Sequence, residues 1–338
     1  MKIYNLALLL LLEGPHSCNQ VIEFKQASPT QDSVQAQKRD IPATAGNILT
    51  SKDGGQTWQS MSEGLPKQLQ EKYGIYRDVF FADDNGIYLT AGNELYQGKP
   101  NAAVTSWTKD IFPDGQGNIA TGKNGLYAYN QNGLITQKLN GQREWKRVFR
   151  NFQGSGVLTV FEAAGGNVFI GTSQGLFRSG NSGKTWKQVQ AGGWAMKLVE
   201  SNGILIATSI KGIIRSNDQG GNWDVVVSEG GVGIAVESIK DGFAAITYNT
   251  QSETRRIRTS YDGGNTWQAI DAGLPPTSSL ASIIQVGNDY LCGHPVGIFK
   301  SSDKGKTWKL MQRSIDNKVF NLSVSGNVIY AMPVSGGC

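Results

Sequence analysis

The stretch "SKDGGQTW", Ser51 to Trp58, recurs four more times along the chain. The other copies are "SGNSGKTW" (179–186), "SNDQGGNW" (216–223), "SYDGGNTW" (260–267) and "SSDKGKTW" (301–308). Each copy places Ser first, Asp or Asn third, Gly fifth and Trp last. A motif that returns at a regular distance indicates a chain built from similar structural units.

Two further tryptophans, Trp107 in "TSW" and Trp145 in "REW", continue the spacing although the rest of the motif is lost. With them, successive motif tryptophans lie about 37 to 49 residues apart. A repeat of about 40 to 45 residues is typical of a four-stranded propeller blade. The spacing therefore predicts seven units, five of them well marked.

The unit from Val157 to Gln190 shows the internal order of a blade. It reads "VLTVFEAAG", "NVFIGTSQ", "GLFRSGNSG" and "TWKQVQ", four short strands separated by turns that contain Gly, Asn and Ser. The recurrent motif is then the turn between the third and fourth strands of each blade.

The two ends of the repeat region are incomplete in complementary ways. Near the N-terminus, "GNILTSKDG" and "TWQS" supply only a third and a fourth strand, whereas "VFNLSVSG" and "NVIYAMPVSG" near the C-terminus supply only a first and a second. We therefore predict an all-β, seven-bladed β-propeller of four-stranded antiparallel blades over residues 41–338, closed by N- and C-terminal strands that share one blade. Closure removes the unpaired strand edges of an open stack.

The composition is typical of many short strands joined by tight turns. The 338 residues include 43 glycines, and only 17% of them are charged. The net charge of +5 is mild and scattered, so we expect no nucleic-acid partner. A local basic cluster of Arg143, Lys146, Arg147 and Arg150 is interpreted as a solvated rim on an outer strand.

The first 40 residues differ from the repeat region. Residues 1–17 combine Lys2, an apolar run from Leu6 to Leu12 and a small residue before Cys18, which is typical of an export signal peptide. The apolar run is shorter than the roughly 20 residues of a membrane span. Residues 18–40 are rich in Gln, Ser, Ala and Lys and are expected to form a flexible tether.

The junction at Cys18 resembles a bacterial lipoprotein signal, in which the cysteine after the cleavage site carries lipid. The resemblance implies an exported lipoprotein of the bacterial cell envelope that contacts the membrane only through this anchor. Simple secretion is the alternative. The other two cysteines, Cys292 in an apolar strand and Cys338 at the last position, do not indicate a disulfide framework.

The recurrent motif resembles the Asp-box, or BNR repeat, of sialidase-type propellers, whose form is roughly Ser-x-Asp-x-Gly-x-Thr-Trp. The matching positions are Asp53 and Trp58, Asn181 and Trp186, Asp218 and Trp223, Asp262 and Trp267, and Asp303 and Trp308. We interpret them as structural, because Asp or Asn accepts backbone N–H bonds in a tight turn, Gly permits positive φ, and Trp can pack between blades. Catalytic or calcium-binding carboxylates are the alternative.

Recognition is expected on the ring face opposite the motif turns, where loops vary over a rigid scaffold. Those loops are longer and more aromatic than the turns of the other face. The candidate contact residues are Tyr73, Tyr76, Arg150, Phe152, Trp194, Tyr248, Arg255, Arg256 and His294. Each of them could instead pack its own loop or be solvated.

Arg258 is a further candidate binding residue because it breaks the repeat. It occupies the third-strand position that Leu49, Phe177, Ile214 and Phe299 fill in other blades. A guanidinium group there must be paired, for instance with Glu253 or Glu237, or reach the central channel, because an unpaired buried charge is costly.

The sequence fits known propeller enzymes poorly. Sialidases need three arginines, a Tyr and Glu pair, an Asp and an early Arg-Ile-Pro motif, whereas this chain offers "RDIP" at 39–42 and seven units instead of six. Xyloglucan-cleaving hydrolases use two rings, and this chain is long enough for one. Only His16 and His294 are present, so we expect no metal centre and no cofactor.

Seven blades, the motif and export together resemble the photosystem II assembly and stability factor type of propeller and its non-photosynthetic relatives. That resemblance implies a scaffold for other proteins, without a photosystem partner. The predicted function is a non-catalytic, monomeric, exported propeller that binds an envelope protein or a glycan. The alternative is a glycoside hydrolase, sialidase-like or of another polysaccharide-cleaving kind.

Overall fold

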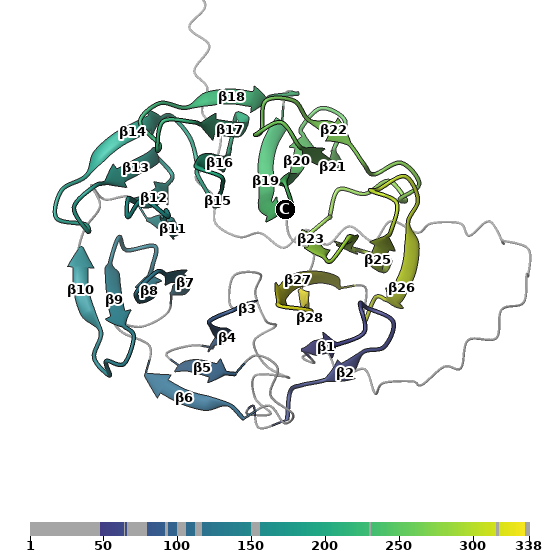
Figure 1. Ribbon diagram of the computed structural model, residues 1–338, viewed down its shortest axis with the longest axis horizontal. Coiled ribbons are helices and arrows are strands. Elements are labelled where there is room, and N and C mark those ends of the chain that lie inside the picture. The colour runs from purple at the N-terminus through teal and green to yellow at the C-terminus, as the bar shows by residue number, and fades with distance from the viewer. Residues whose placement is uncertain are drawn as a thin grey trace, which may run out of the picture. The chain divides into compact units, whose positions relative to one another are not determined.

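The computed structural model describes residues 48–63, 65, 80–91, 94–99, 106–111, 117–149, 156–229, 231–315 and 318–334. In these ranges every regular element is a β-strand, and the strands form seven four-stranded sheets arranged in a ring (Figure 1). All neighbouring strands within a sheet are antiparallel. The predicted seven-bladed propeller is confirmed.

The blades are numbered here from the one that joins the chain ends. Blade 1 contains β27 (Val319–Ser325), β28 (Val328–Val334), β1 (Leu49–Ser51) and β2 (Gln59–Ser60). Blade 2 contains β3 (Phe80–Asp83), β4 (Gly86–Ala91), β5 (Glu94–Gly98) and β6 (Thr108–Ile111). Blade 3 contains β7 (Asn118–Gly122), β8 (Gly125–Tyr129), β9 (Ile135–Leu139) and β10 (Lys146–Phe149).

The remaining blades follow in chain order. Blade 4 contains β11 (Val157–Glu162), β12 (Val168–Thr172), β13 (Gly175–Ser179) and β14 (Lys187–Ala191). Blade 5 contains β15 (Leu198–Ser201), β16 (Ile204–Ser209), β17 (Gly212–Ser216) and β18 (Asp224–Val227). Blade 6 contains β19 (Gly231–Ile239), β20 (Gly242–Asn249), β21 (Thr254–Ser260) and β22 (Gln268–Ala269). Blade 7 contains β23 (Ser282–Val286), β24 (Asp289–His294), β25 (Gly297–Ser301) and β26 (Lys309–Arg313).

Blade 1 closes the ring with strands from both ends of the described chain. In Figure 1 the purple strands β1 and β2 lie beside the yellow strands β27 and β28. Strand β1 pairs with β28 so that Leu49 faces Ala331 and Ser51 faces Ile329. The predicted sharing of one blade is therefore confirmed, and it completes the four strands that neither end could form alone.

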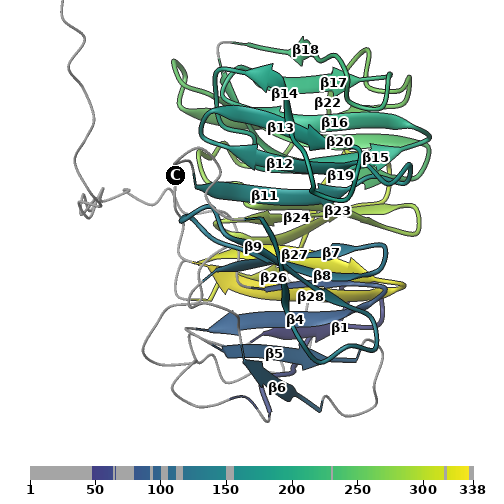
Figure 2. The same ribbon diagram turned by 90° about the vertical axis from the view of Figure 1, so that its left-hand side faces the viewer.

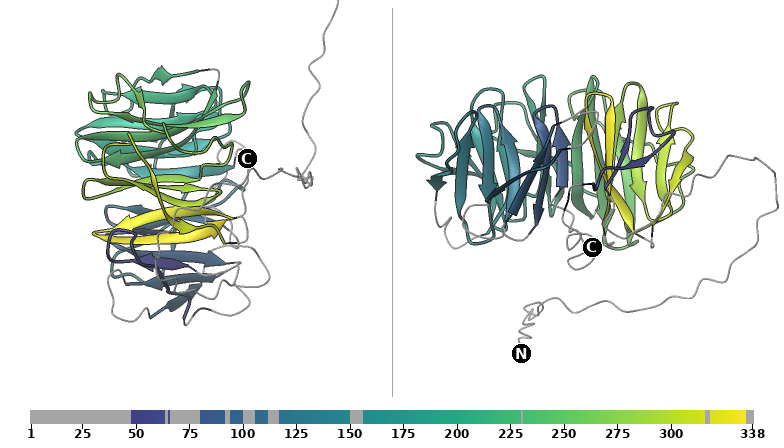
Figure 3. Two further views of the ribbon diagram at one scale, coloured as in Figure 1. Left: turned by 90° about the vertical axis from the view of Figure 1, so that its right-hand side faces the viewer. Right: turned by 90° about the horizontal axis from the view of Figure 1, so that it is seen from below.

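Within each blade the first strand lies nearest the centre of the ring and the fourth lies outermost (Figure 1). The second strands are the most buried; every residue of β12 and of β28 is buried. Both surfaces of such a strand face a neighbouring blade, which explains why these strands read as continuous apolar runs. The strands run across the thickness of the ring, so successive turns fall alternately on its two faces (Figure 2 and Figure 3).

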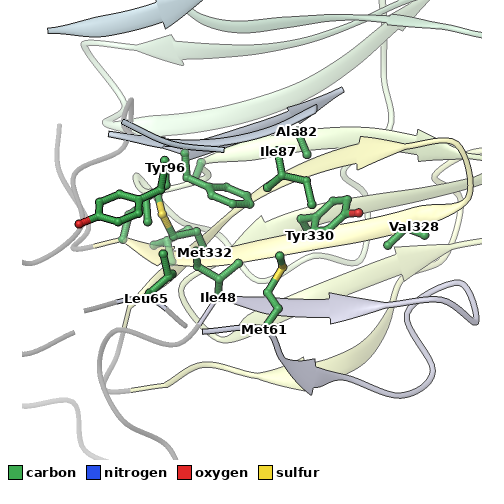
Figure 4. Packing of buried hydrophobic residues seen from close by; sticks show 14 residues of the cluster. Ile48, Met61, Leu65, Ala82, Ile87, Tyr96, Val328, Tyr330 and Met332 are labelled. Carbon is green, nitrogen blue, oxygen red and sulfur yellow. The ribbon is translucent and has the colours of Figure 1, made fainter. Parts of the chain in front are cut away.

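Seven hydrophobic clusters fill the seven interfaces between adjacent blades, and each contains one motif tryptophan. Between blades 1 and 2, for example, Met61 and Tyr330 face Ile87 across the interface (Figure 4), and Trp107 packs against this cluster. Trp145 occupies the corresponding place between blades 2 and 3. The two tryptophans that lost the motif thus kept its packing position.

The five recurrent turns (51–58, 179–186, 216–223, 260–267 and 301–308) share the hydrogen bonds that their Ser and their Asp or Asn side chains accept from backbone N–H groups. In the turn of blade 6, Asp262 Oδ1 accepts the backbone N–H groups of Asn265 (3.0 Å) and Thr266 (2.9 Å), and Thr266 Oγ1 donates to Asp262 Oδ2 (2.6 Å). Ser260 Oγ accepts the Gly264 N–H (3.0 Å), and Trp267 Nε1 donates to the Gly264 carbonyl (3.0 Å). The turn of blade 7 differs in this last bond, because Trp308 Nε1 donates to the Ile270 carbonyl (2.8 Å). The carboxylate therefore orders the turn that places the indole.

These hydrogen bonds make the four turns that contain Asp acid-sensitive. Hydrogen bonds from Thr266 lower the pKa of Asp262 from 3.8 to about 2. A carboxyl group whose pKa is lower in the folded than in the unfolded state stabilises the fold. This stabilisation is complete above the pKa of the unfolded state and is lost as the pH falls through the pKa of the folded state. The stabilisation by Asp262 is therefore lost between about pH 4 and about pH 2.

We expect Asp262→Asn to lose less stability than the parent when pH falls from about 7 to about 3, because the amide does not titrate. The turn of blade 4 is the natural precedent, since Asn181 Oδ1 accepts the Thr185 N–H (2.9 Å) and Asn181 Nδ2 donates to Thr185 Oγ1 (2.9 Å). Denaturant midpoints at the two pH values measure the effect. An equal acid loss in parent and variant would contradict it.

Besides the packed tryptophans, side-chain hydrogen bonds from the innermost strands connect adjacent blades. The sequence did not predict them. Glu162 Oε2 accepts the Lys123 N–H (3.1 Å), Glu200 Oε2 accepts the Ala164 N–H (2.6 Å), and Gln285 Oε1 accepts the Lys240 N–H (2.6 Å). In each case a first-strand side chain binds the first turn of the preceding blade. These hydrogen bonds connect adjacent blades at the inner strands, whereas the tryptophans pack between blades near the outer strands.

Candidate binding face

The recurrent turns and the turns between first and second strands lie on one face of the ring. The opposite face, called the loop face here, carries the turns between second and third strands and the loops that connect blades. Its described segments include 130–134, 173–174, 192–197, 210–211, 228–229, 250–253, 270–281 and 295–296. The candidates Tyr73, Tyr76, Arg150 and Phe152, and the lipidation candidate Cys18, lie outside the described residues.

Among the described hairpins of second and third strands, that of blade 6 is the longest, because β20 and β21 have 8 and 7 residues. The hairpin of β20 and β21 ends in a turn at 250–253. Asn249 organises this turn: its Oδ1 accepts the N–H groups of Gln251 (2.9 Å) and Ser252 (3.1 Å), and its Nδ2 donates to the Glu229 carbonyl (2.9 Å). The tip of the hairpin is therefore fixed.

Two predicted contact residues hold the loop 270–281 against this hairpin. Arg255 is buried, with its guanidinium group 5.9 Å from the centre of the Tyr248 ring and its Nη1 donating to the Leu280 carbonyl. Arg256 forms a bidentate ion pair with Asp271, with Nε 2.7 Å and Nη2 2.9 Å from the two carboxylate oxygens. Both arginines thus have an observed role in positioning the loop.

His294 holds the same loop from the neighbouring blade. Its side chain is buried, Nε2 lies 2.9 Å from the Pro275 carbonyl, and Nδ1 accepts the Val296 N–H (3.0 Å). This arrangement requires the neutral tautomer with hydrogen on Nε2. Burial lowers the pKa of His294 below its ordinary value, which keeps the ring neutral. Both ring nitrogens are engaged within the protein, so the geometry favours a positioning role over ligand contact.

Arg258 lies at the expected third-strand position, opposite Ala245, and is buried. Its Nη2 donates to Glu229 Oε2, so the expectation of Glu253 or Glu237 as its partner is wrong. Glu237 instead pairs with Lys197. Strand alignment could not identify Glu229, because this residue lies in the loop between blades 5 and 6 and approaches Arg258 only in the folded ring.

The pair is unequal in exposure, because the Arg258 side chain is 10% exposed and that of Glu229 is 50% exposed. We expect Glu229→Gln to lower the free energy of unfolding by about 1 to 2 kcal/mol, because a buried guanidinium loses its counter-charge. Arg258→Leu, which introduces the residue type found at position 49, is expected to change it by less than about 1 kcal/mol. Denaturant unfolding measures both, and a larger loss for Arg258→Leu would contradict this ranking.

Trp194 and Ile210 are exposed apolar residues of two neighbouring loops where blades 4 and 5 meet, and together they are called the Trp194 patch here. Their side chains are 51% and 47% exposed. Gly193 lies against Ile210, since a Cβ at Gly193 would be 2.4 Å from Ile210 Cγ1. Of the eight tryptophans, seven belong to the inter-blade clusters and Trp194 is the one left over.

Two carboxylates of the loop face, Glu229 and Asp271, each contact a basic side chain, as described above. Glu253 and Lys211 on the same face are exposed and belong to none of the ion pairs of the described residues. In the described part of the chain, no group of three or more His, Cys, Asp or Glu side chains is arranged to hold a metal ion. The basic residues Arg143, Lys146 and Arg147 are exposed on β10 and the turn before it.

Comparison with known proteins supports the architecture alone. No protein-family model matches the chain, and no curated protein is significantly similar to it. Among the described residues, no helix has the length and apolar character needed to cross a membrane.

Several solved structures share the fold at low sequence identity. The extracellular domain of the one-component system BT4673 from B. thetaiotaomicron has a TM-score of 0.57 and 12% identity over 78% of this chain. An ancestral GH74 enzyme has a TM-score of 0.56 and 14% identity over 76%. This chain spans 39% and 44% of those two chains.

YCF48 is similar over nearly its whole length. The structure from Cyanidioschyzon merolae has a TM-score of 0.50 and 15% identity, and the alignment covers 75% of this chain and 94% of that one. YCF48 bound to D1 peptide has the same TM-score, with 13% identity over 79% of this chain and 96% of that chain. These likenesses and the seven described blades establish that the chain folds as a seven-bladed β-propeller.

Proposed function

We propose that this protein is a non-catalytic propeller of the Asp-box (BNR) type that binds a partner protein through its loop face. The observation that carries the proposal is the exposed Trp194, the one tryptophan with no place in the inter-blade clusters. Exposed tryptophans with apolar neighbours are typical of the anchor points of protein interfaces. The solved complex of YCF48 with D1 peptide, which is similar in fold to this chain, supports peptide binding as a use of this fold.

The proposal includes export and an envelope location, as residues 1–17 and Cys18 predict. Anchoring by lipid at Cys18 and simple secretion differ in one measurable property. Intact mass of the mature protein distinguishes a chain that begins with a lipid-modified Cys18 from an unmodified one.

Photo-cross-linking tests which face binds the partner. A photoreactive amino acid is placed at Ser228 or Ala272, exposed on the loop face, or at Gln56 or Lys184, exposed on the face of the recurrent turns. We expect one envelope protein, identified by mass spectrometry, to cross-link from the first two positions and not from the second two. The reverse pattern would overturn the assignment of the loop face.

The second candidate is a glycoside hydrolase, which the likeness to the GH74 enzyme favours at the level of the fold. Glycosidases use two carboxyl groups, one as acid and one as base or nucleophile. On the described loop face, two carboxylates, Glu229 and Asp271, instead neutralise basic side chains, which supports the binding function. Turnover of xyloglucan or a sialoside, abolished by changing one loop-face carboxylate, would overturn the non-catalytic proposal.

A further inference from the structure

The loop that presents Trp194 is held in place on both sides. The Gly192 N–H donates to the Gln174 carbonyl (3.2 Å), and the Ala195 N–H donates to the Thr172 carbonyl (3.3 Å). On the other side, the N–H groups of Met196 and Lys197 both donate to Thr208 Oγ1, at 3.2 and 3.0 Å. The indole is therefore presented by an ordered backbone, and a ligand would not have to order the loop.

The second half of the Trp194 patch is also fixed. Ile210 lies in the turn between β16 and β17, where Ser209 Oγ donates to the Gly212 carbonyl (3.1 Å) and accepts the Lys211 N–H (3.1 Å). Its side chain rests against Gly193. Two ordered loop segments thus place Ile210 beside the residue that precedes Trp194.

The chemistry of the patch selects the class of ligand. Sugars that stack on an indole also need hydrogen-bonding groups beside it for their hydroxyls, whereas the side chain that lies against the Trp194 loop at Gly193 is the aliphatic Ile210. An apolar side chain of a polypeptide fits such a pair. The patch therefore favours a protein segment over a glycan.

The charge around the patch adds a second requirement. Lys211 directly follows Ile210 and is exposed. It belongs to none of the ion pairs formed by the described residues. The other nearby cation, Lys197, already pairs with Glu237. An acidic group beside the apolar anchor would complement Lys211.

An anionic membrane surface is less well matched than a protein segment. The neighbouring blade presents Glu229 and Glu253 on the same face, both exposed. A flat anionic bilayer that reached Trp194 would also meet these carboxylates. A narrow segment that contacts only blades 4 and 5 would avoid them.

We propose that the Trp194 patch is the docking site for an extended segment of a partner protein in which a large apolar residue is flanked by acidic residues. This inference rests on the proposed function and specifies the partner of the same face. The apolar side chain packs on Trp194 and Ile210, and a flanking carboxylate faces Lys211.

Fluorescence anisotropy with three labelled peptides tests the inference on the full chain. The probes are Asp-Asp-Phe-Leu-Asp-Asp, its basic counterpart Lys-Lys-Phe-Leu-Lys-Lys, and the acidic but polar Asp-Asp-Ser-Ser-Asp-Asp. We expect only the first to bind at micromolar concentration. Equal binding of the acidic and basic Phe-Leu peptides would overturn the charge requirement, and equal binding of the two acidic peptides would overturn the apolar one.

Three variants locate the binding. Trp194→Ala is expected to weaken binding of the first peptide at least about tenfold, as for a hot-spot aromatic residue. Lys211→Glu is expected to weaken the acidic peptide and strengthen the basic one. Val225→Ser, which removes an equally exposed apolar side chain from the outer strand β18, is the matched control and should change neither. An unchanged affinity in Trp194→Ala, with an unchanged unfolding midpoint, would overturn the inference.

Two further outcomes separate this inference from the proposed function. If the envelope protein cross-links from Ser228 and Ala272 in Trp194→Ala and Lys211→Glu as it does in the parent, the loop face binds a partner but the Trp194 patch does not. Binding to vesicles of phosphatidylcholine and phosphatidylglycerol without binding to any peptide would assign the patch to a lipid surface and overturn the inference.

Discussion

Replacing Gly220 with alanine is expected to lower the free energy of unfolding by about 2 to 5 kcal/mol. The residue has φ +79°, where an alanine costs about 1 to 2 kcal/mol. Its added Cβ would also lie 2.3 Å from Phe169 Cζ in the preceding blade. Such overpacking costs about 1 to 3 kcal/mol more, and denaturant unfolding measures the sum.

The same blade supplies a control for the backbone term. Gly203, in the turn between β15 and β16, has φ +76° and no atom within 4 Å of its hypothetical Cβ. Gly203→Ala is therefore expected to cost only the conformational part, about 1 to 2 kcal/mol. If the two variants lost the same stability, the contact between the turn and the preceding blade would be energetically irrelevant.

Truncating Trp58 to alanine is expected to cost about 3 to 5 kcal/mol. This side chain is 7% exposed and packs in the cluster that joins blade 1 to blade 7, next to the strands that close the ring. Its Nε1 also donates to the Gly55 carbonyl (3.1 Å) within the recurrent turn. The variant removes apolar packing at the interface where the ring is held by strands from both chain ends.

Trp194→Ala is the matched control for Trp58→Ala, because it removes the same side chain from an exposed position. We expect it to change the free energy of unfolding by no more than about 0.5 kcal/mol. Thermal and denaturant unfolding of both variants, with near-ultraviolet circular dichroism, measure the difference. A small effect of Trp58→Ala would mean that the motif tryptophans are not the side chains that join the blades.

The number of blades could be predicted from the sequence because each recurrent turn contains positions that few residue types can occupy. Two consecutive residues of each recurrent turn have positive φ. At the first of them Ser182, Gln219 and Lys304 are accepted, whereas the second is glycine in all five turns. The second position faces the preceding blade at close range, so only glycine fits, and the motif persists where other blade residues vary.

The polar bonds between inner strands were not predictable in the same way. The three side chains occupy the same place in their blades. Each lies opposite a second-strand residue that in turn lies opposite the first Ser of the recurrent turn: Glu162 opposite Val168, Glu200 opposite Leu205 and Gln285 opposite Tyr290. They therefore share one position in the blade, and alignment of the repeats could have revealed it. Their partners are backbone N–H groups, which carry no sequence signal.

The loop face shows the same limit. Sequence reasoning selected Arg255, Arg256 and His294 by residue type, and the structure shows that all three hold the loop 270–281. Two of their partners are backbone carbonyls, at Leu280 and Pro275, which no side-chain pattern identifies. Trp194 differed in one respect visible in the sequence, because it lies outside the regular spacing of the other seven tryptophans.

The pairing of β1 with β28 sets the order in which a newly synthesised chain can mature. Leu49 leaves the ribosome long before its partner Ala331, so the first hairpin must wait, incompletely covered, while about 270 further residues are translated. Six blades can form from contiguous sequence during that interval. Only a chain translated through β28 can complete blade 1, so a prematurely terminated product keeps an incomplete blade with an unpaired strand edge that quality-control proteases can recognise.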